Sequence, residues 1–259
     1  MRTSAGSQTV ETRPETDPVA VGLHRPQGRA PLVLVCEHAS AEIPARYRGL
    51  GLPEAEIQRH IGWDIGALAV ARHLADAFDA SLVYATQSRL LMDLNRAPEA
   101  PDAIVTRSED TEIPGNHGLD AAERAFRRQW LYEPFHRTLA AQLDHVELRG
   151  QAPVLVSIHS FTPSFRGVAR PWQLGVLYAG ERRLAERLLP RLKADPTLCV
   201  GDNEPYAPVD GVCHTMDLHA TPRGLRCLML EIRNDLITST AGQQQWAARL
   251  ETELRWLLD

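Results

Sequence analysis

Short apolar runs that each lead into a polar, chemically active residue dominate the pattern of hydrophobic and polar positions in this chain. Runs of this length between helical patterns are typical of buried strands in an α/β sheet. Because ligands and catalytic groups of such sheets gather at the carboxyl ends of strands, we expect the residues after these runs to form one composite site. The runs are residues 31–36 before Glu37 and His38, residues 154–158 before His159, and residues 225–230 before Glu231.

Helical periodicity fills much of the sequence between these runs. Two further short runs, residues 81–85 and 174–178, have strand character, and residues 90–94 form another short apolar piece. The alternation predicts an α/β fold with mostly parallel strands between helical layers. The predicted helices are residues 64–78, a segment from about residue 120 to 146 that Pro134 kinks or splits, residues 182–192, and residues 243–258.

Three segments lack such periodicity. Residues 1–18 are rich in Thr, Ser, Glu and Pro, which predicts a mobile tail ahead of a single domain over residues 19–259. Residues 97–118 carry three prolines and form a long loop, and residues 193–223 are a second irregular stretch. Loops of this length in compact domains are often functional, so we expect both beside the site.

Composition excludes several classes of function. The chain has 259 residues and a formal net charge of -5, which gives no bulk attraction for nucleic acid or anionic membranes. No apolar run approaches the ~20 residues of a membrane span, and the N-terminus lacks an apolar signal segment, so a cytoplasmic location is expected. The four cysteines show no CxxC spacing and are interpreted as structural thiols.

Two histidines at strand ends suggest a metal centre. A catalytic zinc takes three protein ligands from His, Asp and Glu and keeps one position open, and His38 and His159 are two candidates. For the third we rank Asp64 first, Glu42 second and Glu37 third, since neighbours on a strand point to opposite faces and Glu37 adjoins His38. Taken alone, Asp64 at the start of a predicted helix would be a helix cap, and a single histidine would be structural. Their combination favours a site.

Glu231 is the candidate for proton transfer. A carboxylate directly after an apolar run is costly to bury unless it is paired or used. Elsewhere, His60 lies four residues before Asp64 and is expected to orient a ligand by a hydrogen bond, while His214 and His219 lie in the second irregular stretch.

Arginines near these residues suggest an anionic substrate. Arg89 and Arg96 flank an apolar stretch, with Asn95 alongside. Because guanidinium groups bind carboxylates bidentately, these residues are candidates for substrate binding, with surface ion pairs as the alternative. Arg166 and Arg170, downstream of His159, are weaker candidates of the same kind.

A set of short motifs gives the chain a family resemblance. Over roughly residues 31–246 it resembles the N-formylglutamate amidohydrolase family, and more distantly the zinc carboxypeptidases and aspartoacylases. The motifs are Glu37-His38-Ala39, Ile43-Pro44, Trp63-Asp64, Ser88-Arg89, Asp93-Leu94-Asn95-Arg96, Pro134-Phe135-His136, His159-Ser160-Phe161 and Leu230-Glu231-Ile232.

The resemblance implies a zinc amidohydrolase with a three-layer α/β/α, carboxypeptidase-like fold around a mixed sheet. It implies His38 and His159 as zinc ligands and Glu231 as the proton shuttle. As anion-binding groups it implies Arg89, Asn95 and Arg96. The His-x-x-Glu pair of the carboxypeptidases is absent because residue 41 is Ala, and Asp64 is our replacement. Residues 37–40 also depart from the Pro-His-Ser-Gly form common in formylglutamate hydrolases.

Three hypotheses for function follow. The first is zinc-dependent hydrolysis of a small anionic N-acyl amino acid, with N-formyl-L-glutamate as the substrate that the resemblance implies. The second is a zinc carboxypeptidase-like peptidase that acts on short or cell-wall peptides. The third, a non-catalytic binding module, is disfavoured because such a module needs no Glu231 beside both histidines. The oligomeric state is not determined by the sequence.

Overall fold

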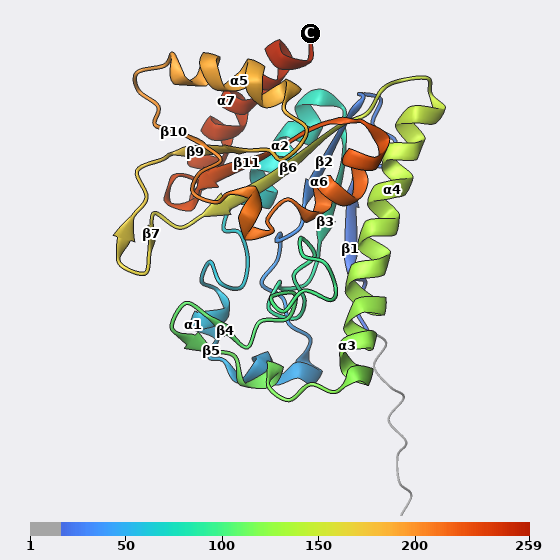
Figure 1. The fold of residues 1–259 in the computed structure, drawn as a ribbon, viewed down its shortest axis with the longest axis vertical. Coiled ribbons are helices and arrows are strands. Elements are labelled where there is room, and N and C mark those ends of the chain that lie inside the picture. Colours follow the sequence, from blue (N-terminus) through green and yellow to red (C-terminus); the bar gives the residue numbers. More distant parts are fainter. Residues whose placement is uncertain (1–16) are drawn as a thin grey trace, which may run out of the picture.

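The computed structural model describes residues 17–259, and a seven-stranded sheet forms its centre (Figure 1). The predicted tail therefore lies outside the described residues, apart from Asp17 and Pro18. Across the sheet the strands are β1 (Val21–His24), β3 (Ser81–Ala85), β2 (Leu32–Cys36), β6 (Val154–Phe161), β11 (Arg226–Arg233), β9 (Leu174–Leu177) and β10 (Val200–Asp202).

The four central strands β3, β2, β6 and β11 run parallel, as the sequence predicts. The outer strands make the sheet mixed, because β1 is antiparallel to β3, and β9 is antiparallel to β11 and parallel to β10. The carboxyl ends of β2, β6 and β11 are thus neighbours at one edge of the sheet. This edge is the place where the sequence predicts the site.

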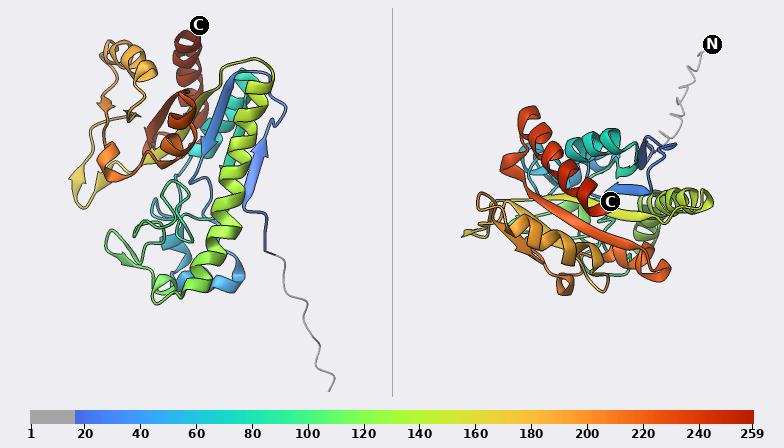
Figure 2. Two further views of the ribbon diagram at one scale, coloured as in Figure 1. Left: turned by 45° about the vertical axis from the view of Figure 1, so that its right-hand side comes forward. Right: turned by 90° about the horizontal axis from the view of Figure 1, so that it is seen from above.

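Helices cover both faces of the sheet, which confirms the predicted α/β architecture (Figures 1 and 2). Along β2 the side chains alternate: Leu32 and Leu34 pack with α2, α5 and α7, whereas Val33 and Val35 pack on the side of α4 and α6. The helices are α1 (Glu54–Ile57), α2 (Ala67–Phe78), α3 (Ala121–Arg127), α4 (Glu133–Leu148), α5 (Arg183–Lys193), α6 (His214–His219) and α7 (Thr240–Leu258).

The predicted helix does not split at Pro134, because the backbone keeps helical dihedral angles at Arg127, Tyr132 and Glu133, and the interruption takes the form of a wider turn. Between α3 and α4 lies a π-helical segment, Arg128–Tyr132, and Pro134 occupies the first turn of α4. Proline has no backbone N–H to continue the α-helical hydrogen-bond ladder, and the π-helical segment directly before α4 is where that ladder changes. Asp120 caps α3 through a 2.8 Å hydrogen bond from the N–H of Glu123.

Several elements differ from the predictions. The strands β6 and β11 do not stop before His159 and Glu231 but continue through them, with the two residues directly opposite each other. Residues 90–94 form buried turns and no strand, since this stretch bends to bring Asp93 and Asn95 to the site. The second irregular stretch contains β10 and α6, which are too short to show a period.

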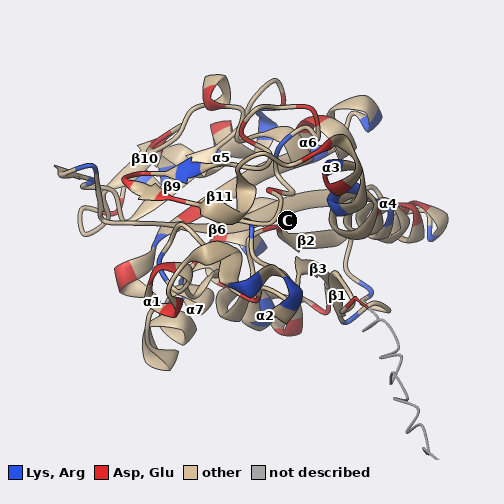
Figure 3. Cartoon of the chain, turned by 90° about the horizontal axis from the view of Figure 1, so that it is seen from below, with Lys and Arg blue, Asp and Glu red and all other residues tan. Residues whose placement is uncertain are grey.

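Loops beyond the carboxyl ends of the parallel strands form a lobe under the sheet in Figure 1. It includes residues 97–118, which are irregular except for a turn and the hairpin β4 (Arg107–Ser108) and β5 (Thr111–Glu112). A second hairpin, β7 (Ser164–Phe165) and β8 (Val168–Ala169), follows β6. Seen from this side, acidic and basic residues are interspersed (Figure 3). Within residues 17–259, no helix combines the length and apolarity that membrane crossing requires.

Candidate active site

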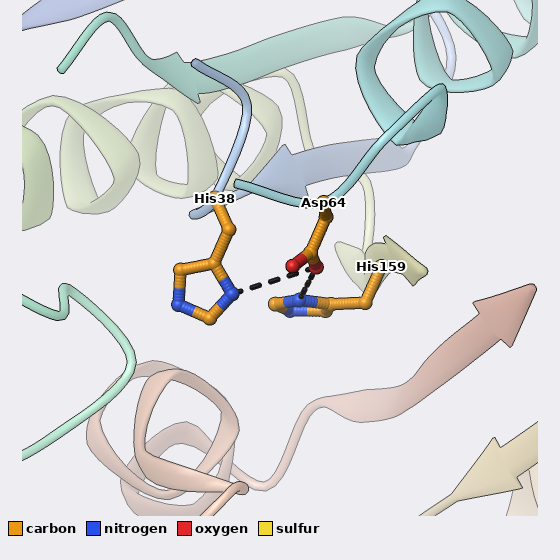
Figure 4. A group of neighbouring side chains, drawn as sticks. All are labelled: His38, Asp64 and His159. Atoms are coloured by element: carbon orange, nitrogen blue, oxygen red, sulfur yellow. Dashed lines mark hydrogen bonds and ion pairs between the residues drawn. The ribbon is translucent and has the colours of Figure 1, made fainter. Parts of the chain in front are cut away.

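Three side chains from different elements meet at the carboxyl edge of the sheet (Figure 4). His38 lies two residues after β2, Asp64 precedes α2, and His159 belongs to β6. All three are buried, and they offer ligand atoms within 4.8 Å of one another. The N–H of Asp64 donates a 2.8 Å hydrogen bond to the carbonyl of His38, which ties the two loops together.

One oxygen of Asp64 faces both imidazole rings. The Nδ1 atom of His159 lies 2.7 Å from Asp64 Oδ2, and Nδ1 of His38 lies 3.4 Å from the same oxygen. The capping alternative for Asp64 is wrong, because the N-cap position of α2 is Gly66. Of the three acidic candidates, Asp64 alone belongs to this group of ligand atoms, and Glu42 is exposed.

Two further buried carboxylates contact the other nitrogen of each ring. Asp93 Oδ1 lies 2.7 Å from Nε2 of His38, and Glu37 Oε2 lies 3.0 Å from Nε2 of His159. The role of Asp93 was missed by sequence reasoning, although it belongs to the Asp-Leu-Asn-Arg string. Asp93 also forms a 2.5 Å ion pair with Arg89.

These contacts set the charge of each group. Burial opposes ionisation, but the attraction of the imidazole of His159 holds the pKa of Glu37 at about 2. The imidazoles likewise keep the pKa of Asp64 below its ordinary value despite burial, and Arg89 and His38 do so for Asp93. Burial lowers the pKa of His159, but the carboxylates of Glu37 and Asp64 outweigh this effect and raise it well above its ordinary value.

Glu231 shares a cavity of about 90 Å³ with this group. It lies opposite His159 in the pairing of β11 with β6, and its Oε2 atom is buried without a hydrogen-bond partner. Burial raises the pKa of Glu231 to about 7. The residues that line the cavity are His38, Asp64, Arg89, Asn95, Arg96, His159, Ser160, Tyr206, Val212, Met229 and Glu231.

The donor set fits a divalent metal ion. Two imidazoles and a carboxylate are a common ligand set for catalytic zinc, which keeps one position open. His38 Nδ1 is buried without a hydrogen-bond partner and points toward the same oxygen as His159 Nδ1. The anionic surroundings would compensate a positive charge at this point.

Comparison with known proteins places the chain in a family. The model of the N-formylglutamate amidohydrolase family matches residues 30–238. The chain belongs to the N-formylglutamate amidohydrolase family. This confirms the resemblance carried by the sequence motifs, and an amide-hydrolysing enzyme is the activity class that the family supports.

Solved structures agree with this fold. The gene product Atu2144 from Agrobacterium tumefaciens is 44% identical, with a TM-score of 0.91 over 93% of this chain and 95% of that protein. The N-formylglutamate amidohydrolase from Ralstonia eutropha JMP134 is 20% identical, with a TM-score of 0.69 over 93% of this chain and 97% of the other. No curated protein sequence matched the chain.

Of the predicted anion-binding residues of this amidohydrolase family member, Arg89, Asn95 and Arg96 line the cavity but differ in their partners. Arg89 contacts Asp93 and lies 3.6 Å from Asp64. Arg96 pairs with Asp102 at 2.7 Å. The amide of Asn95 donates to the carbonyl of Val212 and accepts from the N–H of Thr215, so it also fixes the loop before α6.

Arg166 and Arg170 lie farther out. Arg166 is exposed in the β7–β8 hairpin and does not line the inner cavity. Arg170 is buried and donates a 3.2 Å hydrogen bond to the hydroxyl of Tyr206, which does line it. Sequence reasoning missed Tyr206 because it lies in the second irregular stretch, without a motif around it.

A second pocket of about 160 Å³ adjoins the first and shares Arg89, Arg96 and Tyr206 with it. His60 lines this outer pocket, where its Nε2 atom lies 3.1 Å from Glu109. This contact differs from the predicted hydrogen bond to a metal ligand, and His60 does not line the inner cavity.

Proposed function

We propose that this chain is a metal-dependent amidohydrolase that hydrolyses an N-acyl amino acid, with N-formyl-L-glutamate as substrate and formate and L-glutamate as products. One observation carries the proposal: Glu231 lies in the same buried cavity as His38, Asp64 and His159. Family membership supports amide hydrolysis and this choice of substrate.

His38, Asp64 and His159 would hold one zinc ion. When bound, such an ion supplies Lewis acidity, which polarises a carbonyl and acidifies water. The three side chains are held by hydrogen bonds and ion pairs to one another and to buried carboxylates, so little reorganisation would be needed for binding. The open side of the group is the cavity that Glu231 and Arg89 line.

Glu231 would transfer the proton. Its carboxylate accepts a proton from the attacking water as the oxygen adds to the amide carbon, and then gives this proton to the leaving nitrogen as the carbon–nitrogen bond breaks. A pKa of about 7 suits both steps at neutral pH, because the group is a competent base before the first step and a competent acid before the second.

The arginines would bind the charges of substrate and transition state. Arg89 is positioned to stabilise the developing oxyanion, since it lines the cavity beside Asp64. Arg96 and Asn95 would bind a substrate carboxylate and orient the amide. Arg170 would contribute through Tyr206, and Arg166 would attract anions at the surface.

A peptidase acting on short or cell-wall peptides is a second candidate. The observation in its favour is the outer pocket, which continues the cavity past Arg96 and Tyr206 and has room for a larger group than formyl. Phe165 and His60 line this extension together with Asp102.

The test is a substrate panel on purified protein with and without chelator. We expect formate release from N-formyl-L-glutamate, loss of this activity on chelation, and its recovery when zinc returns. N-acetyl-L-glutamate and short peptides separate the alternatives, since amino-acid release from peptides without formate release would favour the peptidase. Formylglutamate hydrolysis that persists after complete metal removal contradicts the proposal.

A further inference from the structure

Glu37 is a buried carboxylate that the proposed reaction does not use. Its side chain is 0% exposed, its Oε2 atom lies 3.0 Å from Nε2 of His159, and the same oxygen accepts a 2.8 Å hydrogen bond from Ser157. It lies behind the His159 ring, and the group of ligand atoms does not include it. Burying an ionised carboxylate is costly, so this position calls for an explanation.

The two imidazoles of the site face carboxylates at both nitrogens, with a hydrogen bond at Nε2 of His38 and at Nδ1 of His159 and a close ion-pair contact at the other nitrogen of each ring. Each ring turns Nδ1 toward Asp64 Oδ2 and Nε2 toward a buried carboxylate, Asp93 for His38 and Glu37 for His159. A neutral imidazole has one N–H and one lone pair. With a metal ion bound, a carboxylate beside Nε2 would favour the N–H there and leave the lone pair of Nδ1 for the ion.

The pairing of β2 with β6 explains how Glu37 reaches this ring. The strands are parallel and Val35 lies opposite Ser157, so two more residues in the same register bring Glu37 opposite His159. Ser157 and His159 are two residues apart on β6 and therefore share a face of the sheet. One strand thus supplies both the ring that Glu37 contacts and the hydroxyl that fixes Glu37.

We propose that Glu37 is a positioning residue that orients His159, and fixes its tautomer, for a metal ion bound with His38 and Asp64. The inference rests on the proposed metal-dependent function. Partners of this kind also raise the basicity of the ligand, and their loss typically weakens metal binding 10- to 100-fold. Glu37 therefore acts on the metal through His159 and does not contact it.

The test compares zinc binding by Glu37→Gln and Glu37→Leu with that of the full-length wild-type protein. After metal removal, the dissociation constant is measured by competition with a chromophoric chelator. Glutamine keeps an oxygen acceptor, so we expect about tenfold weaker binding, and leucine has none, so we expect about 100-fold. The visible spectrum of the Co²⁺-loaded variants should also differ from that of wild type, because the ligand field reports the orientation of His159.

Glu42→Gln is the matched control. It removes the same charge five residues along, at an exposed side chain, and should leave zinc affinity unchanged. If Glu37 only stabilises the fold, its variants will lower the thermal stability of the metal-free protein while zinc affinity stays at the wild-type value, and this result overturns the inference.

Ser157→Ala keeps the inference testable if the leucine variant does not fold. It frees Glu37 from the serine hydroxyl without removing the carboxylate, and we expect a several-fold loss of zinc affinity. If both Ser157→Ala and Glu37→Gln bind zinc with wild-type affinity, the positioning role of Glu37 is wrong, while the proposed metal-dependent function is unaffected. Absence of zinc binding by the wild-type protein would instead overturn the proposed function, and this inference with it.

Discussion

Two groups of buried or half-buried histidines lie in the described part of this chain, and their surroundings differ. The ligand cluster comprises His38, Asp64 and His159, in which both nitrogens of each ring face carboxylates. The neutral cluster comprises His136, His214 and His219, whose rings contact one another, a tyrosine hydroxyl and a backbone carbonyl.

Hydrogen bonding in the neutral cluster fixes its protons. His136 Nε2 donates to the carbonyl of Leu94 at 2.9 Å, so its Nδ1 accepts from Nε2–H of His219, also at 2.9 Å. Tyr132 and His214 are linked at 2.7 Å. Burial lowers the pKa of His136 to about 3 and that of His219 to about 4.

The comparison shows that neighbours, and not residue type, decide what a buried imidazole does. Carboxylates around the ligand cluster favour a cation, whereas neutral partners in the second cluster favour uncharged rings that act as hydrogen-bonding supports. The two are connected, because His136 holds Leu94, which lies between Asp93 and Asn95. The neutral cluster thus supports the loop that carries a partner of the ligand cluster.

The largest expected effect is a loss of turnover without a loss of zinc binding, on substitution of Glu231 beside the ligand cluster. Glu231→Gln removes the proton acceptor but keeps the shape of the side chain, so we expect turnover to fall by about 10²- to 10⁴-fold. Zinc content and substrate binding should be retained, measured by metal analysis and by equilibrium binding of N-formyl-L-glutamate. Retention of most of the hydrolysis rate would reject Glu231 as the proton shuttle.

A matched pair of substitutions tests the comparison directly. His159→Asn removes a proposed ligand, and we expect zinc affinity to fall by more than the ~100-fold typical of a lost hydrogen-bonding partner. His136→Asn makes the same chemical change in the neutral cluster and should leave zinc affinity within a few-fold of wild type. Zinc affinity is measured by chelator competition on folded protein. If the two variants lose equal amounts of zinc affinity, the claim that only the ligand cluster binds the metal is wrong.

The pH dependence of activity should follow the ionisation of Glu231, which lies beside the ligand cluster, and should not depend on the neutral cluster. Because burial raises the pKa of Glu231 to about 7, the carboxylate needed as base is lost as the pH falls below this value. We expect kcat/KM to decrease about tenfold per pH unit below pH 7 and to level off above it. His136→Asn should show the same decrease in kcat/KM below pH 7. An increase in kcat/KM as the pH falls would contradict the assignment of Glu231 as the base.

Sequence reasoning found the ligand cluster because each member is visible locally. His38 and His159 come after apolar runs, and Asp64 stands at the start of a helical stripe, so position along the chain already indicated their place at the sheet edge. The parallel core of the fold was predictable for the same reason, since fully buried strands read as continuous apolar runs.

The partners of these residues could not be predicted in the same way. Glu37 and Asp93 each contact a histidine through tertiary structure, and 120 residues separate Glu37 from Ser157. Strand β10 has three residues and helix α6 has six, too few to show a period. The antiparallel direction of β9 depends on the connection between strands, about which the pattern of apolar positions carries no information.

The smallest expected effect concerns the contribution of the neutral cluster to stability. The pKa of His219 in the folded state, about 4, lies below the ~6.5 of an unfolded histidine, so on acidification the unfolded state takes up the proton first. Stability is therefore retained above pH ~6.5 and is lost as the pH falls toward 4. This group should account for a loss on the order of 3 kcal/mol over that interval.

His219→Gln removes this titration, and its longer side chain can still donate an amide N–H to Nδ1 of His136. We expect the free energy of unfolding, measured in urea with chelator present, to decrease less between pH 7.5 and pH 4.5 in this variant than in wild type. His73→Asn, at an exposed position of α2, is the control and should retain the wild-type slope. If His219→Gln also retains it, His219 takes up its proton as readily in the folded state as in the unfolded state, and the neutral cluster is not kept uncharged by its surroundings.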